Sequence, residues 1–174
     1  KPHAGINQNL LRKRAEMLET QARQLRWLAA TIHERATQDA LTKELDQDES
    51  KIDLLRAALL IARLDNGEIE IEHYLKTVDS MAATIQSALK PKATEKDKLE
   101  AVGRYMFEQS GFHGSRGDYY NRANSYLNEV IDDREGIPIT LAVLYMEIAN
   151  RLGIPLQGLP LPCLLYTSPS PRDR

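Results

Sequence analysis

The first part of the chain carries one regular stripe of apolar residues on a polar background. Between Leu10 and Ala36 the stripe advances in alternating steps of four and three, with no Gly or Pro inside it. This heptad spacing predicts one long helix. The stripe consists of Leu11, Ala15, Leu18, Ala22, Leu25, Ala29, Ile32 and Ala36.

Two arrangements of this helix fit the pattern. One is a homodimer in which Leu11, Leu18, Leu25 and Ile32 face a second copy. The other is an amphipathic helix docked on its own domain. Trp27 and Leu28 widen the apolar face, which favours docking in a core.

Further along, apolar positions recur at helical spacing between residues that start or stop helices. Ser50 fits an N-cap, and Thr94 with Asp97 resembles a capping box. Asn66-Gly67 is expected to end a helix in the left-handed conformation, and Pro138 suits a first turn. Thr37–Leu45 is expected as a short separate helix or as a fraying continuation of the first. The later expected segments are Ser50–Leu64, Glu72–Leu89, Thr94–Gly111, Ser125–Ile131 and Ile139–Arg151.

The remaining segments are expected to be loops and one strand. Gly111, Gly114 and Gly117 are expected to be turn glycines with positive φ, because no strand and no phosphate-binding Lys-Ser/Thr accompanies them. Leu156–Leu161 is the first strand candidate. In the helix before the loop, the residues expected inside are Leu99, Val102, Met106 and Phe107.

Composition narrows the class without assigning a function. The 174 residues fit one domain with an added helix, and 42% apolar with 28% charged residues is ordinary for soluble proteins. A net charge of −2 gives no reason to expect nucleic acid or an anionic membrane as partner. The single cysteine excludes an internal disulfide and fits a reducing compartment, so we expect a cytoplasmic protein.

The last residues look foreign to the rest of the chain. Cys163–Arg174, with the sequence CLLYTSPSPRDR, resembles the translation of a transposase end and adapter used in sequencing libraries. We expect this tail to be non-native and leave it out of the fold prediction. The only cysteine is therefore not a candidate nucleophile.

The sequence from Phe107 to Pro162 closely resembles the SirB-type (invasion-regulator) transglutaminase-like family, whose bacterial members often carry tetratricopeptide repeats. The run Asn124–Pro138 and the later Leu152–Pro155 carry the resemblance, and Asp53–Asn66 looks like the family's upstream helix. The resemblance implies a mostly α chain: the helical part of a papain-like, transglutaminase-like α+β domain whose sheet is largely missing. The expected division is residues 1–48 as helix and connector, 49–162 as the truncated domain, and 163–174 as the tail.

The resemblance also implies where a nucleophile would stand. Active members of the superfamily have Cys at the N-terminus of the core helix, with His and Asp on following strands, because the helix end and the imidazole favour a thiolate. Alignment on Leu152–Pro155 and Ala142 puts Pro138 at that position. Thr140 carries the nearest hydroxyl. The His and acidic positions would follow Pro162.

Several other polar residues have both a functional and a structural explanation. Tyr119, Tyr120, Asn124, Ser125 and Asn128 match motif positions of the family. They either form the lip of a pocket, or they cap the short helix and bury the tyrosine rings against the loop. The acidic residues Glu129, Asp132, Asp133 and Glu135 are expected on a solvated face. The four histidines lack ligand spacing, so we expect no metal and no cofactor.

These observations leave three functions open. The leading hypothesis is a non-catalytic interaction or regulatory module, a pseudoenzyme that binds a protein or peptide. The second is a hydrolase or acyl-transferase that uses a non-Cys nucleophile such as Thr140. The third is a helical assembly protein that dimerises through residues 10–36. We also expect weak folding, because missing strands would leave part of the last helix uncovered: Leu141, Leu144, Tyr145 and Ile148.

Overall fold

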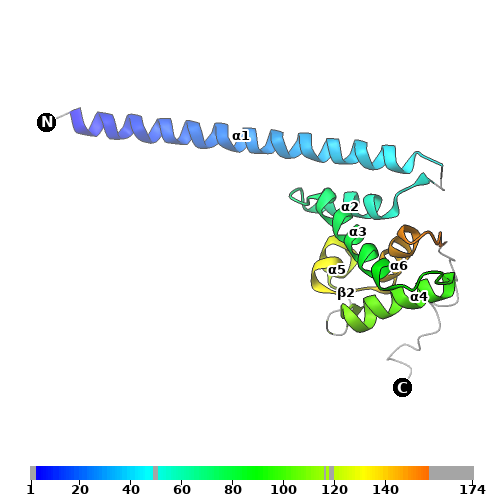
Figure 1. The fold of residues 1–174 in the computed structure, drawn as a ribbon. Helices are drawn as coiled ribbons and strands as arrows, with labels where there is room; N and C mark the ends of the chain where they lie inside the picture. Colours follow the sequence, from blue (N-terminus) through cyan, green and yellow to red (C-terminus); the bar gives the residue numbers. More distant parts are fainter. Residues whose placement is uncertain (1–2, 49–50, 116, 118–119, 157–174) are drawn as a thin grey trace, which may run out of the picture.

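The computed structural model describes residues 3–48, 51–115, 117 and 120–156. This part of the chain is mostly helical, as the sequence predicts, with a two-stranded parallel sheet (Figure 1). The α-helices are α1 (His3–Leu45), α2 (Leu54–Asp65), α3 (Ile71–Ala88), α4 (Glu95–Gly103), α5 (Leu127–Asp133) and α6 (Pro138–Arg151). The remaining elements are the π-helix η2 (Arg104–Gln109), strand β1 (His113–Gly114), the 3-10 helix η3 (Arg122–Ser125) and strand β2 (Glu135–Gly136).

Helix α1 is one continuous arm. It has 43 residues, which at the α-helical rise corresponds to about 65 Å. Its C-terminal part packs on α2, while the rest projects away from the domain (Figure 1). The prediction of one long helix is confirmed, but docking of its apolar face is wrong: Trp27 and Leu28 are exposed. The domain does not extend along the arm to cover them.

The joint between α1 and α2 is held by a few specific contacts. Thr37 is buried there. Arg63 Nε donates to His33 Nε2 at 3.3 Å, and the Asp53 amide donates to Glu44 Oε1 at 2.9 Å. Gly67 lies against His33, where an added Cβ would sit 3.1 Å from the ring. Gly67 therefore allows α1 to approach the α2–α3 turn.

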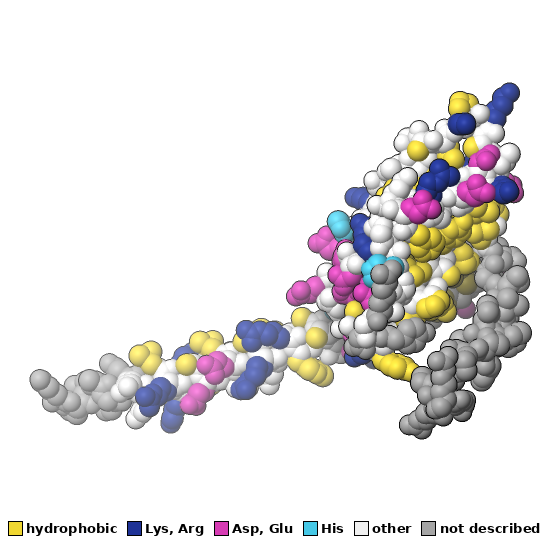
Figure 2. Space-filling view, turned by 90° about the horizontal axis from the view of Figure 1, so that it is seen from below, with side chains coloured by type: hydrophobic (Ala, Val, Ile, Leu, Met, Phe, Trp, Pro, Cys, Tyr) yellow, Lys and Arg dark blue, Asp and Glu magenta, His cyan; other side chains and the backbone are white. Residues whose placement is uncertain are grey.

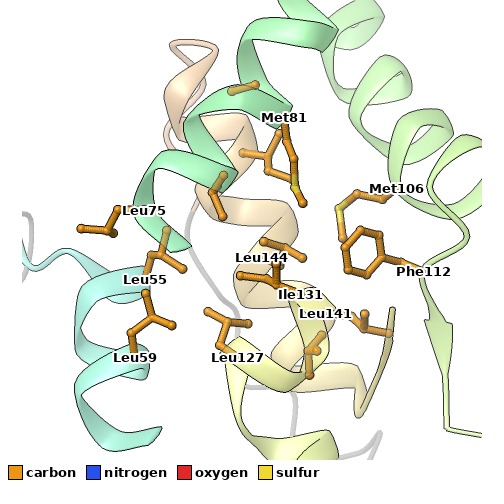
Figure 3. Packing of buried hydrophobic residues seen from close by; sticks show 14 of the residues in the cluster. Leu55, Leu59, Leu75, Met81, Met106, Phe112, Leu127, Ile131, Leu141 and Leu144 are labelled. Carbon is orange, nitrogen blue, oxygen red and sulfur yellow. The ribbon is translucent and has the colours of Figure 1, made fainter. Parts of the chain in front are cut away.

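Helix α6 forms the centre of the domain. Apolar side chains of α2, α3, η2 and α5 pack against those of α6, as Figure 3 shows. Leu144 and Ile148 are fully buried, and Leu141 is buried as well. The expectation that this face stays uncovered is therefore wrong, because the other helices cover it. The exposed side of α6 is a different one, which includes Ile139 and Ala142.

The helix ends agree with the sequence in part. The capping box is confirmed: Asp97 N donates to Thr94 Oγ1 at 3.2 Å, and Thr94 N donates to Asp97 Oδ2 at 2.8 Å. Hydrogen bonds from Thr94 hold the pKa of Asp97 below its usual value. For α2 the N-cap is Asp53, whereas the expected cap Ser50 lies outside the described residues. Asn66 ends α2 at φ −126°, so the expected left-handed end is wrong.

The segment after α4 differs most from expectation. The helix continues as the π-helix η2, closed by a bond from Ser110 N to Tyr105 O at 2.8 Å. Val102 and Met106 are buried as expected, but Phe107 is 49% exposed. Phe107 follows Met106 directly, and two adjacent helical residues do not share one face.

The loop after η2 contains the first strand. His113 and Gly114 of β1 pair in parallel with Glu135 and Gly136 of β2. Gly111 has φ +73° as expected, whereas Gly114 in β1 does not have the expected left-handed φ. The φ of Gly117 involves residue 116, which lies outside the described residues. The expected strand Leu156–Leu161 begins at the last described residue, which is not in a strand, and its other residues lie outside the described part. In the described part, no helix is both long and apolar enough to cross a bilayer.

Candidate functional site

The predicted nucleophile position lies at the start of the central helix. Pro138 is the first residue of α6, after the extended N-cap Ile137. Proline fits here because a first-turn residue needs no amide hydrogen for the helix. Pro138 and Ile139 are exposed, so this helix end faces the surface. The position therefore lies at a helix N-terminus, where the resemblance implies a nucleophile, and its proline carries no sulfur or hydroxyl.

The neighbouring hydroxyl of Thr140 points into the protein. Its Oγ1 lies 2.9 Å from the carbonyl oxygens of both Asn124 and Ile137. The Ile137 amide donates to the same Asn124 carbonyl at 3.2 Å. Thr140 and Asn124 are both buried. The hydroxyl proton is thus held by backbone oxygens, and Thr140 fastens η3 to the start of α6.

Gly136 makes this close arrangement possible. A Cβ on Gly136 would lie 2.8 Å from Thr140 Oγ1 and 3.0 Å from both methyl groups of Val130. Its carbonyl also accepts from the Ser115 amide at 3.1 Å. Because glycine has no Cβ, strand β2 can pass between α5, β1 and α6 at this position.

Gly136→Ala is expected to lower the free energy of unfolding by about 1–3 kcal/mol, since the methyl group has no room. Urea unfolding followed by circular dichroism measures the loss. Gly114→Ala is the matched control, because nothing lies within 4 Å of a Cβ at Gly114 in the neighbouring strand. Equal stability of the two variants would show that β2 does not pack against Thr140.

Ser115 is a polar residue that the sequence analysis missed. Its Oγ is buried and has no hydrogen-bond partner within the described residues. Its amide is bonded to the carbonyl of Gly136, two residues before Pro138. No sequence signal distinguished Ser115, because its position depends on pairing of β1 with a strand about twenty residues later.

Asn128 contributes to a separate feature beside α2. It lines a cavity of about 220 Å³ together with Ala62, Asp65, Asn66, Ile69, Ala123, Tyr126 and Glu129. Asn128 Nδ2 donates to Glu129 Oε1 at 2.9 Å, while its buried Oδ1 has no partner among the described residues. Arg122 bridges Asp65 at 3.0 Å and the Tyr126 hydroxyl at 2.9 Å. Two carboxylates beside the cavity favour a ligand that donates hydrogen bonds.

The other predicted site residues are spread over the surface. Tyr120 is 91% exposed and Ser125 is exposed, so ring burial at Tyr120 is wrong. Ser125 does not cap the following helix either, because the N-cap of α5 is Tyr126 and no side chain bonds there. At the start of η3, Asn121 accepts from Ala123 N. Tyr119 lies outside the described residues.

The acidic residues around the end of α5 are partly engaged. Asp132 and Asp133 are exposed, as expected of a solvated face. Asp132 accepts a hydrogen bond from the Tyr74 hydroxyl at 2.7 Å. Partial burial and this carboxylate raise the pKa of Tyr74 to about 12. Across the described residues, no three His, Cys, Asp or Glu side chains gather as a metal site would require.

Comparison with known proteins gives the family. Residues 72–171 match the transglutaminase-like superfamily. This match covers more than half of the chain, which therefore belongs to that superfamily. The match also extends into residues 163–171, which belong to the tail that we expected to be non-native. The described structure ends before that tail.

Several relatives match parts of the chain. A UPF0162 protein of Xylella fastidiosa is 39% identical over 115 residues, which are 66% of this chain and 41% of the relative. A UPF0162 protein of Vibrio cholerae is 29% identical over 117 residues, 67% of this chain and 43% of the relative. Human F-box only protein 21 is 42% identical over 64 residues, 37% of this chain and 10% of the relative. The chain spans less than half the length of these bacterial relatives, and no solved structure matches significantly.

Proposed function

We propose that this chain is a SirB-type, non-catalytic member of the transglutaminase-like superfamily that binds a protein or peptide. The observation that carries the proposal is that Pro138 occupies the first position of α6, where the resemblance implies the nucleophile. A transglutaminase-like reaction needs a nucleophile that attacks a carbonyl carbon. A proline ring at the helix start supplies none.

The bonding of Thr140 supports the same proposal. A Thr nucleophile needs a base that takes its proton. The described partners of the Thr140 hydroxyl are two backbone carbonyls, which accept hydrogen bonds but do not act as bases at neutral pH. Its burial also keeps substrate carbonyls away. These contacts favour an interaction module over acyl transfer through Thr140.

A turnover assay on the full-length protein tests the proposal. Amide hydrolysis and glutamine–amine crosslinking are measured with peptide substrates, against heat-inactivated protein. We expect no rate above that background. Turnover that is lost when Thr140 or Ser115 is replaced by Ala, in a variant that still folds, would overturn the proposal.

Pro138→Cys tests whether the position itself is suited to a nucleophile. The N-terminus of α6 favours the thiolate, so we expect the pKa of the introduced thiol to fall below that of an ordinary cysteine. At pH 7, iodoacetamide should alkylate it about two- to tenfold faster than the thiol introduced by Ala142→Cys, at an exposed position one turn further along. Both variants carry Cys163→Ser.

Slower alkylation of Pro138→Cys than of Ala142→Cys would contradict the assignment. It would mean that residue 138 does not occupy the activating end of the helix, and the alignment on Leu152–Pro155 would be out of register. Intact-protein mass spectrometry gives both rates from one time course.

A further inference from the structure

The heptad stripe of α1 is an apolar surface that the domain leaves uncovered. Leu11, Leu18, Leu25 and Ile32 are each between 52% and 69% exposed. Figure 2 shows hydrophobic side chains spaced along the projecting arm, between basic and acidic ones. A long row of regularly spaced Leu and Ile in water is costly for a monomer, which indicates that this face has a partner.

The stripe and the docked face lie on different sides of α1. Contact with α2 uses His33, Thr37 and Leu41, of which Thr37 is buried. Ala36 belongs to the stripe and is exposed, although it directly precedes Thr37. Adjacent helical residues point about 100° apart. A second helix can therefore lie along the stripe without displacing α2.

The composition of the stripe indicates what the second helix is. Every second stripe position is Ala, and the positions between are Leu or Ile. In a parallel pair of this helix, Ala would face Ala and Leu would face Leu, so layers would alternate between underfilled and crowded. In an antiparallel pair each layer joins one Ala with one Leu or Ile, which fills the interface evenly.

We propose that α1 pairs antiparallel with α1 of a second copy of this chain through this stripe. The register that uses all eight stripe positions places Ala22 opposite Leu25 of the second copy. The remaining layers are then Leu18 with Ala29, Ala15 with Ile32, and Leu11 with Ala36, each occurring twice by symmetry. The two domains lie at opposite ends of the paired helices.

Charges on one flank of the stripe agree with this register, whereas on the other flank Arg14 faces Arg35 of the second copy. Glu19 and Arg26 flank the stripe on the same side, at equivalent heptad positions. In the proposed register each Glu19 faces Arg26 of the second copy. Shifting the pair by one heptad would place Glu19 opposite Glu19 and Arg12 opposite Arg26, which is repulsive. On the Glu19 and Arg26 flank, the charges thus oppose this one-heptad shift.

Sedimentation velocity of the full chain tests the pairing. We expect a dimer at tens of micromolar, and Leu25→Glu should weaken it at least about a hundredfold, because each dimer loses two buried leucines. Trp27→Glu is the matched control, since Trp27 is equally exposed on the same turn but lies outside the stripe. Neither residue is buried in the monomer, so circular dichroism should be unchanged in both variants. A monomeric chain, or equal effects of the two substitutions, would overturn the proposal.

A spin-label distance tests the orientation. With Asn9→Cys in a Cys163→Ser background, the antiparallel register separates the two labels by about 44 Å along the helix axis. A parallel pair would bring them within roughly 25 Å. Double electron–electron resonance measures this distance. A short distance would overturn the antiparallel arrangement, and a long one supports it.

Discussion

Leu144→Ala is expected to lower the free energy of unfolding by about 2–5 kcal/mol. Leu144 has no exposed surface and lies on α6, where the core side chains of α2, α3 and α5 meet (Figure 3). Removing three carbons there leaves a cavity that these helices cannot close without moving. Urea unfolding followed by far-ultraviolet circular dichroism measures the loss.

The matched control is Ile139→Ala on the same helix. Ile139 is 67% exposed, so its truncation should change the free energy of unfolding by no more than about 0.5 kcal/mol. If the two variants lost equal stability, α6 would not be the centre of the core. This face of α6 would then be as uncovered as the sequence analysis expected from the missing strands.

Arg151→Ala is expected to lower the free energy of unfolding by about 3–5 kcal/mol at pH 7, because it leaves a buried carboxylate without its partner. Arg151 Nη1 donates to Glu147 Oε2 at 2.7 Å, and Glu147 is buried. On its other side Arg151 Nε donates to the exposed Asp79 at 2.6 Å. Without the guanidinium, the Glu147 charge would have to stay in the protein interior unpaired.

The pH dependence identifies the cause of this loss. Burial already raises the pKa of Glu147 above its ordinary 4.5, and losing Arg151 should raise it further. A raised carboxyl pKa gives stability that is present below the ordinary pKa and lost as the pH rises through the folded value. The deficit of Arg151→Ala should therefore be small at pH 4 and should grow as the pH rises to 7. A deficit independent of pH would contradict this explanation, and Asp79→Asn should cost under about 1 kcal/mol.

Local signals predicted helices well. The heptad spacing of residues 10–36 predicted a helix that the structure contains, and the Thr94–Asp97 capping box and the Pro138 start follow from hydrogen bonds within one turn. The transglutaminase-like resemblance is confirmed at the level of the superfamily. Such features depend on neighbouring residues alone, so the sequence contains them directly.

Features set by distant contacts were predicted poorly. Trp27 was expected in a core, but the domain does not reach that part of α1. The backbone at the end of α2, at Asn66, lies next to the close approach of His33 to Gly67, which no local pattern encodes. The π-helix and the exposure of Phe107 also lack a local signal. In each case the outcome depends on packing between segments far apart in sequence.

The candidate site was predicted in part. The Asn124 carbonyl accepts from the Thr140 hydroxyl and the Ile137 amide at the start of α6, where Pro138 follows Ile137. Asn128 instead lines the cavity beside α2, and Ser115 joins the strand next to the site without having been predicted. A motif shows which residues belong together, but whether a backbone or a side-chain atom makes the contact depends on the fold.

Intact-protein mass spectrometry after incubation with an acyl donor tests the central claim most directly. The full-length protein is mixed with an activated ester or a glutamine-containing peptide, quenched and weighed, with Pro138→Cys beside it. Both proteins carry Cys163→Ser. We predict that peptide mapping finds no acyl group at Thr140 or Ser115 of the protein with Pro138, and a thioester at residue 138 of Pro138→Cys with the activated ester. An acyl group on the natural chain, mapped to Thr140 or Ser115, would contradict the account.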